Sequence, residues 1–150
     1  EVRRFWDGPI ALSGAIATGR GGLAAQAMGA DLAYIGTRFV ATHEARASAA
    51  YKQMIVDSTA ADIVYSPTFT GVAGNYLRGS IVAAGLDPDH LPTRDKTAMS
   101  FASEGGAKTK AWRDIWGAGQ GVGAIDEVLG AGEVVARMIA EYAQAKARLA

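Results

Sequence analysis

The amino-acid sequence predicts an α/β fold that contains a pair of parallel strands. Two short apolar runs, at residues 10–12 and 32–35, each end in a turn that contains glycine. The stretch between them has apolar residues at helical spacing over residues 23–28, followed by Gly29 where the glycine after a helix belongs. Two buried strands joined by one helix form a βαβ unit, and the strands of such a unit run parallel.

Both predicted strands end at the same edge of the sheet, which is the edge where α/β proteins bind ligands. Glycine turns at this edge suggest a phosphate site, and two kinds can be excluded. A P-loop that begins at Gly14 requires a lysine and a hydroxyl residue where the chain has Arg20 and Gly21. A dinucleotide-binding fingerprint requires another glycine spacing and an acidic residue at the end of the second strand.

A third kind of phosphate site fits the pattern better. In a (β/α)₈ barrel, the loops after strands seven and eight bind phosphate. Such a site requires small residues and free backbone N–H groups at both strand ends, and Ser13, Gly14, Gly36 and Thr37 provide them. The pattern leaves one alternative open, namely a βαβ unit whose glycine turns bind no ligand.

The next predicted elements follow the second strand. A helix is expected over residues 43–56, capped by Thr37 or Thr42, because its apolar residues fall on one face. A short strand at residues 63–65 and a helix at residues 78–84 follow. The solvated face of the 43–56 helix is predicted to carry Glu44, Arg46 and Lys52.

Periodicity weakens between residues 57 and 102, which indicates an insertion that covers a functional site. A short helix is predicted around residues 111–116, with Trp112, Ile115 and Trp116 on one side. The glycine-rich run at residues 117–123 is either a stretch where backbone approaches a ligand or a flexible turn.

The last helix is predicted over residues 131–148. On its outer face Arg137 is expected to form i,i+4 ion pairs with Glu133 and Glu141. Its buried stripe is expected to contain Val134, Val135, Met138, Ile139 and Tyr142.

Composition excludes several classes of protein. The 150 residues fit one domain, and 15 basic and 15 acidic residues give no net charge, so we expect no nucleic-acid partner. No apolar run approaches the ~20 residues of a membrane helix, so we expect no membrane partner. Cysteine is absent, which excludes disulfides and fits a cytoplasmic location. Neither His43 nor His90 belongs to a cluster with metal-ligand spacing, so no metal site is predicted.

Five stretches of the sequence carry a resemblance to a known family. They are S-G-A-I-A-T-G-R-G at residues 13–21, G-A-D-L-A-Y-I-G-T-R-F at 29–39, A-Y-K-Q-M-I-V-D at 50–57, F-T-G-V-A-G-N-Y-L at 69–77 and A-W-R-D-I-W-G-A-G-Q-G-V-G at 111–123. These stretches resemble the nitronate monooxygenases, which are FMN-dependent (β/α)₈ barrels. The first two are shared with related FMN barrels, whereas the later ones indicate the nitronate group in particular.

The resemblance implies that the chain is the C-terminal part of such a barrel. Strands seven and eight with their flanking helices would be followed by a covering insertion and a C-terminal helix. A complete barrel needs roughly 200–250 residues or more. We therefore expect residues 1–150 to be a fragment of a single FMN-binding domain that lacks strands one to six.

The resemblance also implies part of an FMN site. Gly14 and Ala15 match the glycine pair after strand seven, with alanine in place of the second glycine, and Gly36 and Thr37 match the end of strand eight. Their backbone N–H groups and the Thr37 hydroxyl are expected to bind the FMN phosphate. Gln120 is expected to contact the flavin or the substrate.

The reaction implied by the resemblance is oxidation of an alkyl nitronate by flavin and oxygen to a carbonyl compound and nitrite. The catalytic histidine of the family lies upstream of strand seven, so no catalytic residue is assigned here, and His43 and His90 are expected on the surface. Arg38 is expected either to approach the phosphate or to pair with a carboxylate. Two alternatives remain open: an NAD(P)H-dependent enoyl reductase of the same barrel type, and a non-catalytic flavin-binding fragment.

Overall fold

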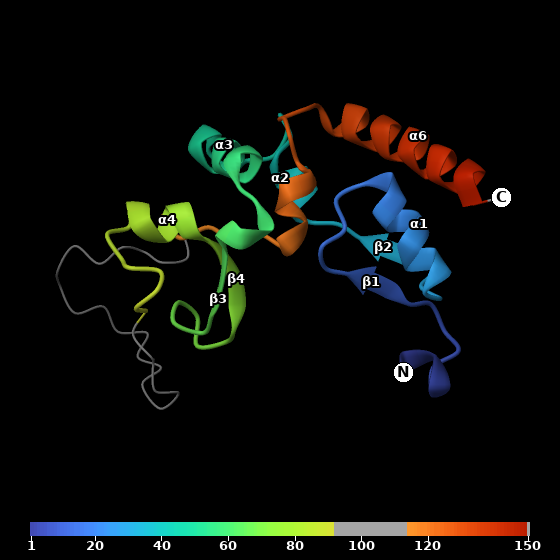
Figure 1. The fold of residues 1–150 in the computed structure, drawn as a ribbon, viewed down its shortest axis with the longest axis horizontal. Coiled ribbons are helices and arrows are strands. Elements are labelled where there is room, and N and C mark those ends of the chain that lie inside the picture. The colour runs from blue at the N-terminus through green and yellow to red at the C-terminus, as the bar shows by residue number, and fades with distance from the viewer. Residues whose placement is uncertain (92–113, 150) are drawn as a thin grey trace.

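The computed structural model describes residues 1–91 and 114–149 of the chain. Strands and helices alternate in the first part, and a β-hairpin follows (Figure 1). In chain order the elements are η1 (Val2–Arg4), β1 (Ala11–Ser13), α1 (Gly19–Ala27), β2 (Leu32–Tyr34), α2 (Thr37–Val40), α3 (Ala49–Asp57), η2 (Ala60–Asp62), β3 (Ile63–Ser66), β4 (Gly74–Leu77), α4 (Arg78–Ala83), η3 (Gln120–Ala124) and α6 (Ala131–Leu149).

The first sheet is the predicted βαβ unit. β1 and β2 pair in parallel, with Ser13 opposite Tyr34, which confirms the prediction of parallel strands. α1 connects them, and the Thr18 hydroxyl caps its first turn by accepting a hydrogen bond from the Gly21 amide at 3.1 Å. Gly29 follows α1 with a φ of +92°, as expected for the glycine after a helix.

The strands of this sheet are exposed, so the prediction that they are buried is wrong for this chain. Leu32 and Tyr34 on β2 are 61% and 68% exposed. Within the described residues, β1 and β2 pair only with each other. The hydrophobic core lies outside these two strands and consists of Ala17, Ala41, Ile55, Leu77, Ala118, Val122 and Ile125.

The second sheet is an antiparallel hairpin of β3 and β4. The predicted strand at residues 63–65 is confirmed. The sequence does not predict β4, because Gly74 and Asn75 are poor strand formers. α4 follows β4 directly and confirms the helix predicted at residues 78–84. A third segment joins the hairpin, since Gly117 pairs antiparallel with Tyr76.

α3 begins later than predicted. It starts at Ala49 rather than at residue 43, and the Ser48 hydroxyl caps it by accepting a backbone hydrogen bond at 3.2 Å. The two threonines predicted as caps therefore do not cap this helix. Glu44 does not belong to the helix either: its two carboxylate oxygens accept hydrogen bonds from the Ala131 amide at 3.0 and 2.9 Å, at the start of α6.

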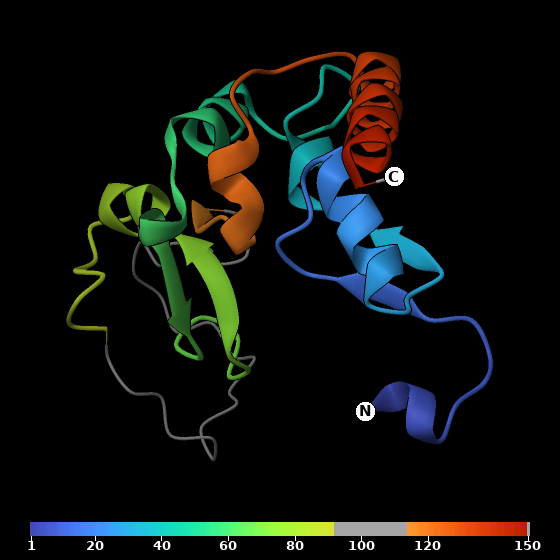
Figure 2. The same cartoon turned by 45° about the vertical axis from the view of Figure 1, so that its right-hand side comes forward.

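α6 packs along α1 (Figure 2). The two helices approach closely at Gly19, where an added Cβ would lie 1.9 Å from the Met138 carbonyl oxygen. The Gly19 amide also donates a hydrogen bond to the Glu141 carboxylate at 2.7 Å, which caps α1 from the neighbouring helix. Glycine at this position is therefore required by the contact between the helices.

The predicted faces of α6 are wrong in two respects. Val135 and Ile139 are exposed, so the buried stripe is narrower than expected. Arg137 pairs with Asp126 and Glu127, which precede α6, and not with the two glutamates of its own helix. The competing carboxylates come from a loop whose position the helical spacing does not reveal.

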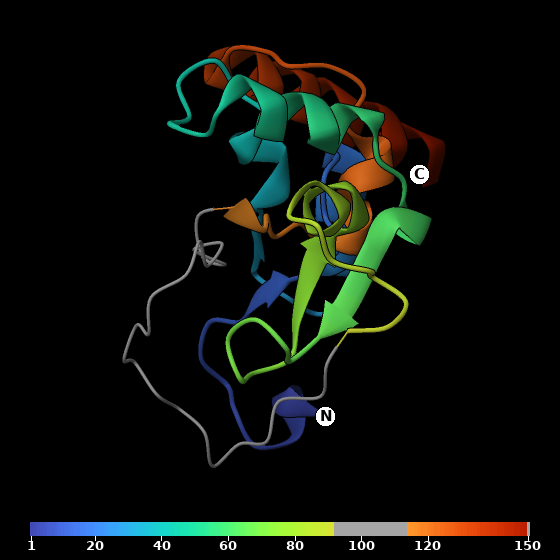
Figure 3. The ribbon, with the colours of Figure 1, turned by 90° about the vertical axis from the view of Figure 1, so that its left-hand side faces the viewer.

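The elements are arranged in a row. The hairpin and α4 lie at one end, β1, β2, α1 and α6 lie at the other, and α2 and η3 lie between them (Figure 1). α3 and α6 both run along one edge of the molecule (Figure 3). In the part of the chain that the structure describes, every helix is too short or too polar to cross a bilayer. The prediction for Trp112 and the rest of the segment at residues 92–113 lies outside the described residues.

Candidate functional site

A small hollow opens where β1 and β2 end. It has a volume of about 160 Å³. The residues that line it are Ser13, Gly14, Ala15, Ile16, Ala17, Tyr34, Gly36, Thr37, Gly119 and Gly121. Gly14 and Gly36 therefore lie at one cavity at the carboxyl edge of two parallel strands, as their matched positions in the sequence predict.

The backbone after β1 lines one side of this hollow. Gly14 and Ala15 are both in the left-handed region, with φ of +108° and +55°. Glycine adopts this conformation freely, whereas it costs another residue about 1–2 kcal/mol. Ala15 thus occupies a conformation that favours glycine, and its amide has no acceptor among the described residues.

The backbone after β2 lines another side of the hollow. The amides of Gly36 and Thr37 likewise donate to no acceptor in the described part of the chain. Gly36 has a φ of −109°, so its conformation does not require glycine. A Cβ added at Gly36 would meet nothing within 4 Å, so this residue, which lines the hollow, borders open space. The small residue keeps this volume free.

The third wall comes from the glycine-rich run near residue 120. The Gly119 amide donates a hydrogen bond to the Thr37 hydroxyl at 2.9 Å. A Cβ added at Gly121 would lie 2.6 Å from the carbonyl oxygen of Ala15, so this residue must be small. Thr37 accepts in this contact, and its own O–H hydrogen remains available to a ligand.

Gln120 is not among the residues that line the hollow. Its side chain pairs with the Asn75 side chain of β4 through two reciprocal amide hydrogen bonds of 3.2 Å. The structure thus brings Gly14, Ala15, Gly36 and Thr37 together at the hollow and places Gln120 beside it, on the hairpin side. The sequence gives no sign of the Asn75 contact, because the two residues are 45 positions apart.

Arg38 follows neither of the two expectations for it. Its side chain is buried, with 3% of its surface exposed, and donates a hydrogen bond to the backbone carbonyl of Glu127 at 2.8 Å. The other terminal nitrogen, Nη2, has no partner in the described part of the chain. Burial, followed by the nearby charge of Arg137, lowers the pKa of Arg38. Arg38 therefore ties α2 to the loop before α6.

Neither histidine belongs to the hollow. His43 and His90 are both exposed, as expected, and His90 lies 2.7 Å from the Asp87 carboxylate, which raises the pKa of His90 through this hydrogen bond. Among the described residues, no group of three or more acidic or histidine side chains is placed to hold a metal ion.

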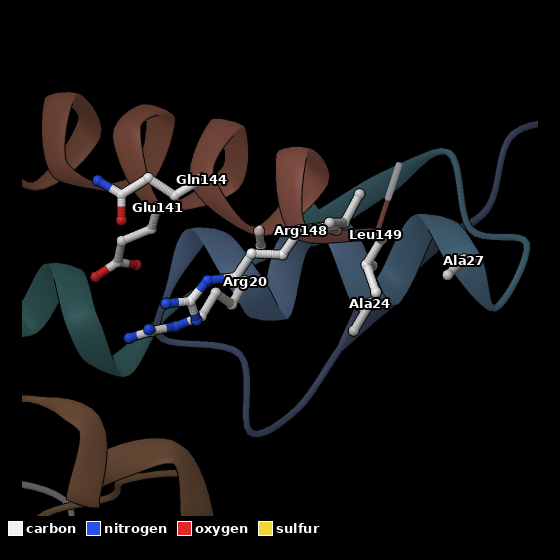
Figure 4. Close-up of a pocket in the computed structure, with 9 residues that line it drawn as sticks. Arg20, Ala24, Ala27, Glu141, Gln144, Arg148 and Leu149 are labelled. Atoms are coloured by element: carbon white, nitrogen blue, oxygen red, sulfur yellow. The ribbon is translucent and has the colours of Figure 1, made fainter.

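A larger cavity of about 320 Å³ lies between α1 and α6 (Figure 4). Arg20 and Ala24 of α1 and Glu141 and Arg148 of α6 line it. Its walls are the outer side chains of two helices, and Glu141 is already engaged with a backbone amide. We regard the smaller hollow as the candidate functional site, because residues from both strand ends of the βαβ unit line it, whereas the larger cavity is lined by residues of two helices.

The model of the family described as nitronate monooxygenase matches residues 1–141. The chain belongs to the nitronate monooxygenase family. Enzymes of this family are flavin oxidoreductases, which agrees with a phosphate-sized hollow at two strand ends.

Individual relatives agree with this assignment. Rv1533 of Mycobacterium tuberculosis, named as a monooxygenase, is 29% identical over 146 residues, which are 89% of this chain and 39% of that protein. The nitroalkane oxidase of Streptomyces ansochromogenes has a TM-score of 0.70 and 31% identity, over 99% of this chain and 43% of its own. The FabK M276A mutant of Thermotoga maritima has a TM-score of 0.71 and 25% identity, over 99% of this chain and 46% of its own. The chain spans less than half of each relative.

Proposed function

We propose that this chain supplies the FMN phosphate site of an enzyme that oxidises alkyl nitronates with oxygen to a carbonyl compound and nitrite. One observation carries the proposal: the residues at two parallel strand ends, Gly14–Ala15 and Gly36–Thr37, line one small hollow. Membership of the nitronate monooxygenase family supports the reaction class. The nitroalkane oxidase among the structural neighbours supports a nitro compound as substrate.

The residues present fit a phosphate group. The amides of Ala15, Gly36 and Thr37 have no acceptor among the described residues, so a dianion in the hollow would receive hydrogen bonds from both strand ends. The Thr37 hydroxyl adds one donor while its oxygen holds the Gly119 amide in place. The open volume at Gly36 leaves room for the anion.

The remaining parts of the site are assigned by the family resemblance. FMN, when bound, supplies the oxidising group for the nitronate. We propose that Gln120, held beside the hollow by Asn75, contacts the flavin or the substrate. The catalytic base is proposed to lie in another part of the whole protein, because both histidines described here are exposed and lie away from the hollow.

We also propose that the chain is the C-terminal portion of a (β/α)₈ barrel, with β1 and β2 as strands seven and eight. Its coverage of less than half of each neighbour supports this view, as do the exposed apolar side chains of β2. The other strands of the barrel would cover these side chains. A cytoplasmic location completes the proposal, since a chain without cysteine needs no oxidising compartment.

A second candidate is a flavin oxidoreductase of the same fold that takes electrons from a reduced nicotinamide, such as an enoyl reductase. The fold alone does not separate the two, because FabK and the nitroalkane oxidase resemble this chain equally well, with TM-scores of 0.71 and 0.70. The two candidates differ in electron donor, and this difference can be measured directly.

The test uses the whole protein purified with its flavin. Released flavin is identified as FMN or FAD by chromatography, and nitrite release and oxygen uptake are followed with an alkyl nitronate. We expect FMN and nitrite release without NADH. Steady-state NADH oxidation with an enoyl thioester and no nitrite would favour the second candidate. Bound flavin without turnover of either substrate would favour a non-catalytic flavin-binding protein.

A further inference from the structure

The wall of the hollow formed by Gly119 and Gly121 is held in position by contacts of the preceding residues, 116–118. Residues 116–118 lie along β4 as a short third strand: the Leu77 amide donates to the Trp116 carbonyl at 2.8 Å, and the Ala118 amide donates to the Asn75 carbonyl at 3.3 Å. In this antiparallel pattern the backbone groups of the middle residue, Gly117, point away from the partner strand. β4 therefore fixes only one side of this segment.

Tyr51 of α3 holds the other side. Its hydroxyl donates a hydrogen bond to the Gly117 carbonyl. Its ring stacks on that of Trp116, with the ring centres 5.0 Å apart and the planes inclined by 17°. The Tyr51 side chain is partly buried, and this burial raises the pKa of its phenol, so the hydroxyl stays protonated and remains a donor.

Two residues farther along, the same segment forms the wall of the hollow. The Gly119 amide donates to the Thr37 hydroxyl, and Gly121 lies so close to the Ala15 carbonyl that no side chain fits between them. A shift at Gly117 would therefore be transmitted through two peptide units to the groups that face the ligand.

We propose that Tyr51 is a positioning residue for the phosphate site: it does not line the hollow, but its hydrogen bond to Gly117 sets the position of the wall at Gly119 and Gly121. This inference rests on the proposed function, because it takes the hollow to be a phosphate site. It predicts that Tyr51 affects recognition of the phosphate and not of the flavin ring.

The test compares two ligands that differ only by the phosphate. The dissociation constants of FMN and riboflavin are measured by flavin fluorescence on the flavin-free whole protein, as wild type and as Tyr51→Phe. The phenylalanine variant keeps the ring that stacks on Trp116 and loses only the hydroxyl. We expect FMN to bind about five- to tenfold more weakly, the effect of one lost hydrogen bond, with riboflavin unchanged.

The chain offers a matched control. Tyr142 of α6 also donates its hydroxyl to another element, to the Gln26 side chain of α1, and neither residue lines the hollow. Tyr142→Phe should leave both affinities unchanged. The ratio of the two dissociation constants does not depend on the folded fraction, so partial unfolding of a variant would not imitate the expected result.

Each other outcome has a definite meaning. Equal weakening of FMN and riboflavin by Tyr51→Phe, or no weakening of either, would overturn the positioning role and leave the phosphate site intact. A wild-type protein that binds riboflavin as tightly as FMN would overturn the proposed phosphate site, and the role of Tyr51 with it.

Discussion

The backbone amide of Gly119 donates a hydrogen bond to the side-chain oxygen of Thr37, 2.9 Å away and 82 positions earlier in the chain. This contact joins the end of the second strand of the βαβ unit to a glycine-rich run on the far side of the hairpin. The Thr37 oxygen is the acceptor in this hydrogen bond. The hydrogen of the same hydroxyl is therefore donated to a different group. In the proposed site that acceptor is the phosphate.

Thr37→Val should weaken FMN binding by about 1.5–3 kcal/mol, since it removes a hydrogen bond to a charged group. Thr37→Ser should retain most of the affinity, because serine supplies the same donor and acceptor. The measurement is the FMN dissociation constant of the whole protein. Thr42→Val is the matched control, because it also removes one threonine hydrogen bond, to the Phe39 carbonyl at 2.8 Å, away from the hollow. Similar losses in the Thr37 and Thr42 valine variants would contradict this role.

Gly36→Val should abolish most FMN binding while the protein still folds. The backbone conformation of Gly36 suits any residue, so the effect comes only from filling the open volume where the anion would lie. Flavin content after purification, read from its absorbance, measures the effect. Gly132→Val in α6 is the control, because its side chain would also meet nothing within 4 Å but far from the strand ends. Equal flavin content in both variants would argue against the site.

Gly121→Ala should lower the stability of the protein by about 1–3 kcal/mol and weaken FMN binding, because the new methyl would lie 2.6 Å from the Ala15 carbonyl. Gly123→Ala should have a much smaller effect, since the nearest atom there is 3.6 Å away. Thermal unfolding and FMN affinity measured on both variants would check this. A Gly121→Ala protein that matches Gly123→Ala in both quantities would show that the close approach is not required.

The first turn of α6 should loosen in acid. Hydrogen bonds from the Ala131 amide lower the pKa of the Glu44 carboxyl below its usual value of 4.5. A lowered pKa means that the stabilisation is present above the unfolded value and is lost as pH falls through the folded one. Amide hydrogen exchange at Ala131 should therefore accelerate below about pH 4.5, after correction for intrinsic exchange.

Glu44→Gln tests the cause of this acid effect. The glutamine side chain has no carboxyl to titrate, so exchange at Ala131 should be faster than in the wild type at neutral pH and nearly independent of pH in this range. If the wild type and Glu44→Gln lose protection together as the pH falls, another group is responsible.

Residues 1–150 expressed alone should be poorly soluble and should not purify with flavin. β1 and β2 have open edges among the described residues, and Leu32 and Tyr34 expose apolar surface beside them. Open edges and apolar patches favour aggregation. Flavin absorbance, a thermal unfolding scan and a nitrite assay on this chain provide the measurement. A cooperatively folding, yellow and active product would show that the chain is a complete domain.

The sequence predicts the βαβ unit well because every signal for it is local. The turn glycines, the helical spacing and Gly29 all lie within one stretch, and the structure agrees with each. α3 begins late because Ser48 offers a better cap than the threonines before it. The residues at 43–48 would also suit the exposed face of a helix, so the sequence does not exclude an earlier start. The helical period alone does not decide between these starts.

Contacts between distant segments could not be predicted. Arg137 has one glutamate four residues before it and another four residues after it in the same helix. It nevertheless pairs with Asp126 and Glu127, because the loop before α6 brings these carboxylates closer. The hydrogen bonds of Tyr51 and Gln120 link residues 66 and 45 positions apart. Sequence motifs therefore identify the strand ends of the candidate site, but they do not identify the segment at Gly119 and Gly121 that forms its remaining wall.

The hollow is built almost wholly from peptide groups, and the described residues that line it include no acidic, basic or histidine side chain. Affinity for a phosphate ester there should follow the ionisation of the ester itself, whose second pKa is about 6. Mildly acidic solution would then weaken retention of FMN by discharging the ligand, while the protein side of the contact stays constant. The pH at which the flavin dissociates would thus report on the ionisation of the cofactor and not on a side chain of the lining.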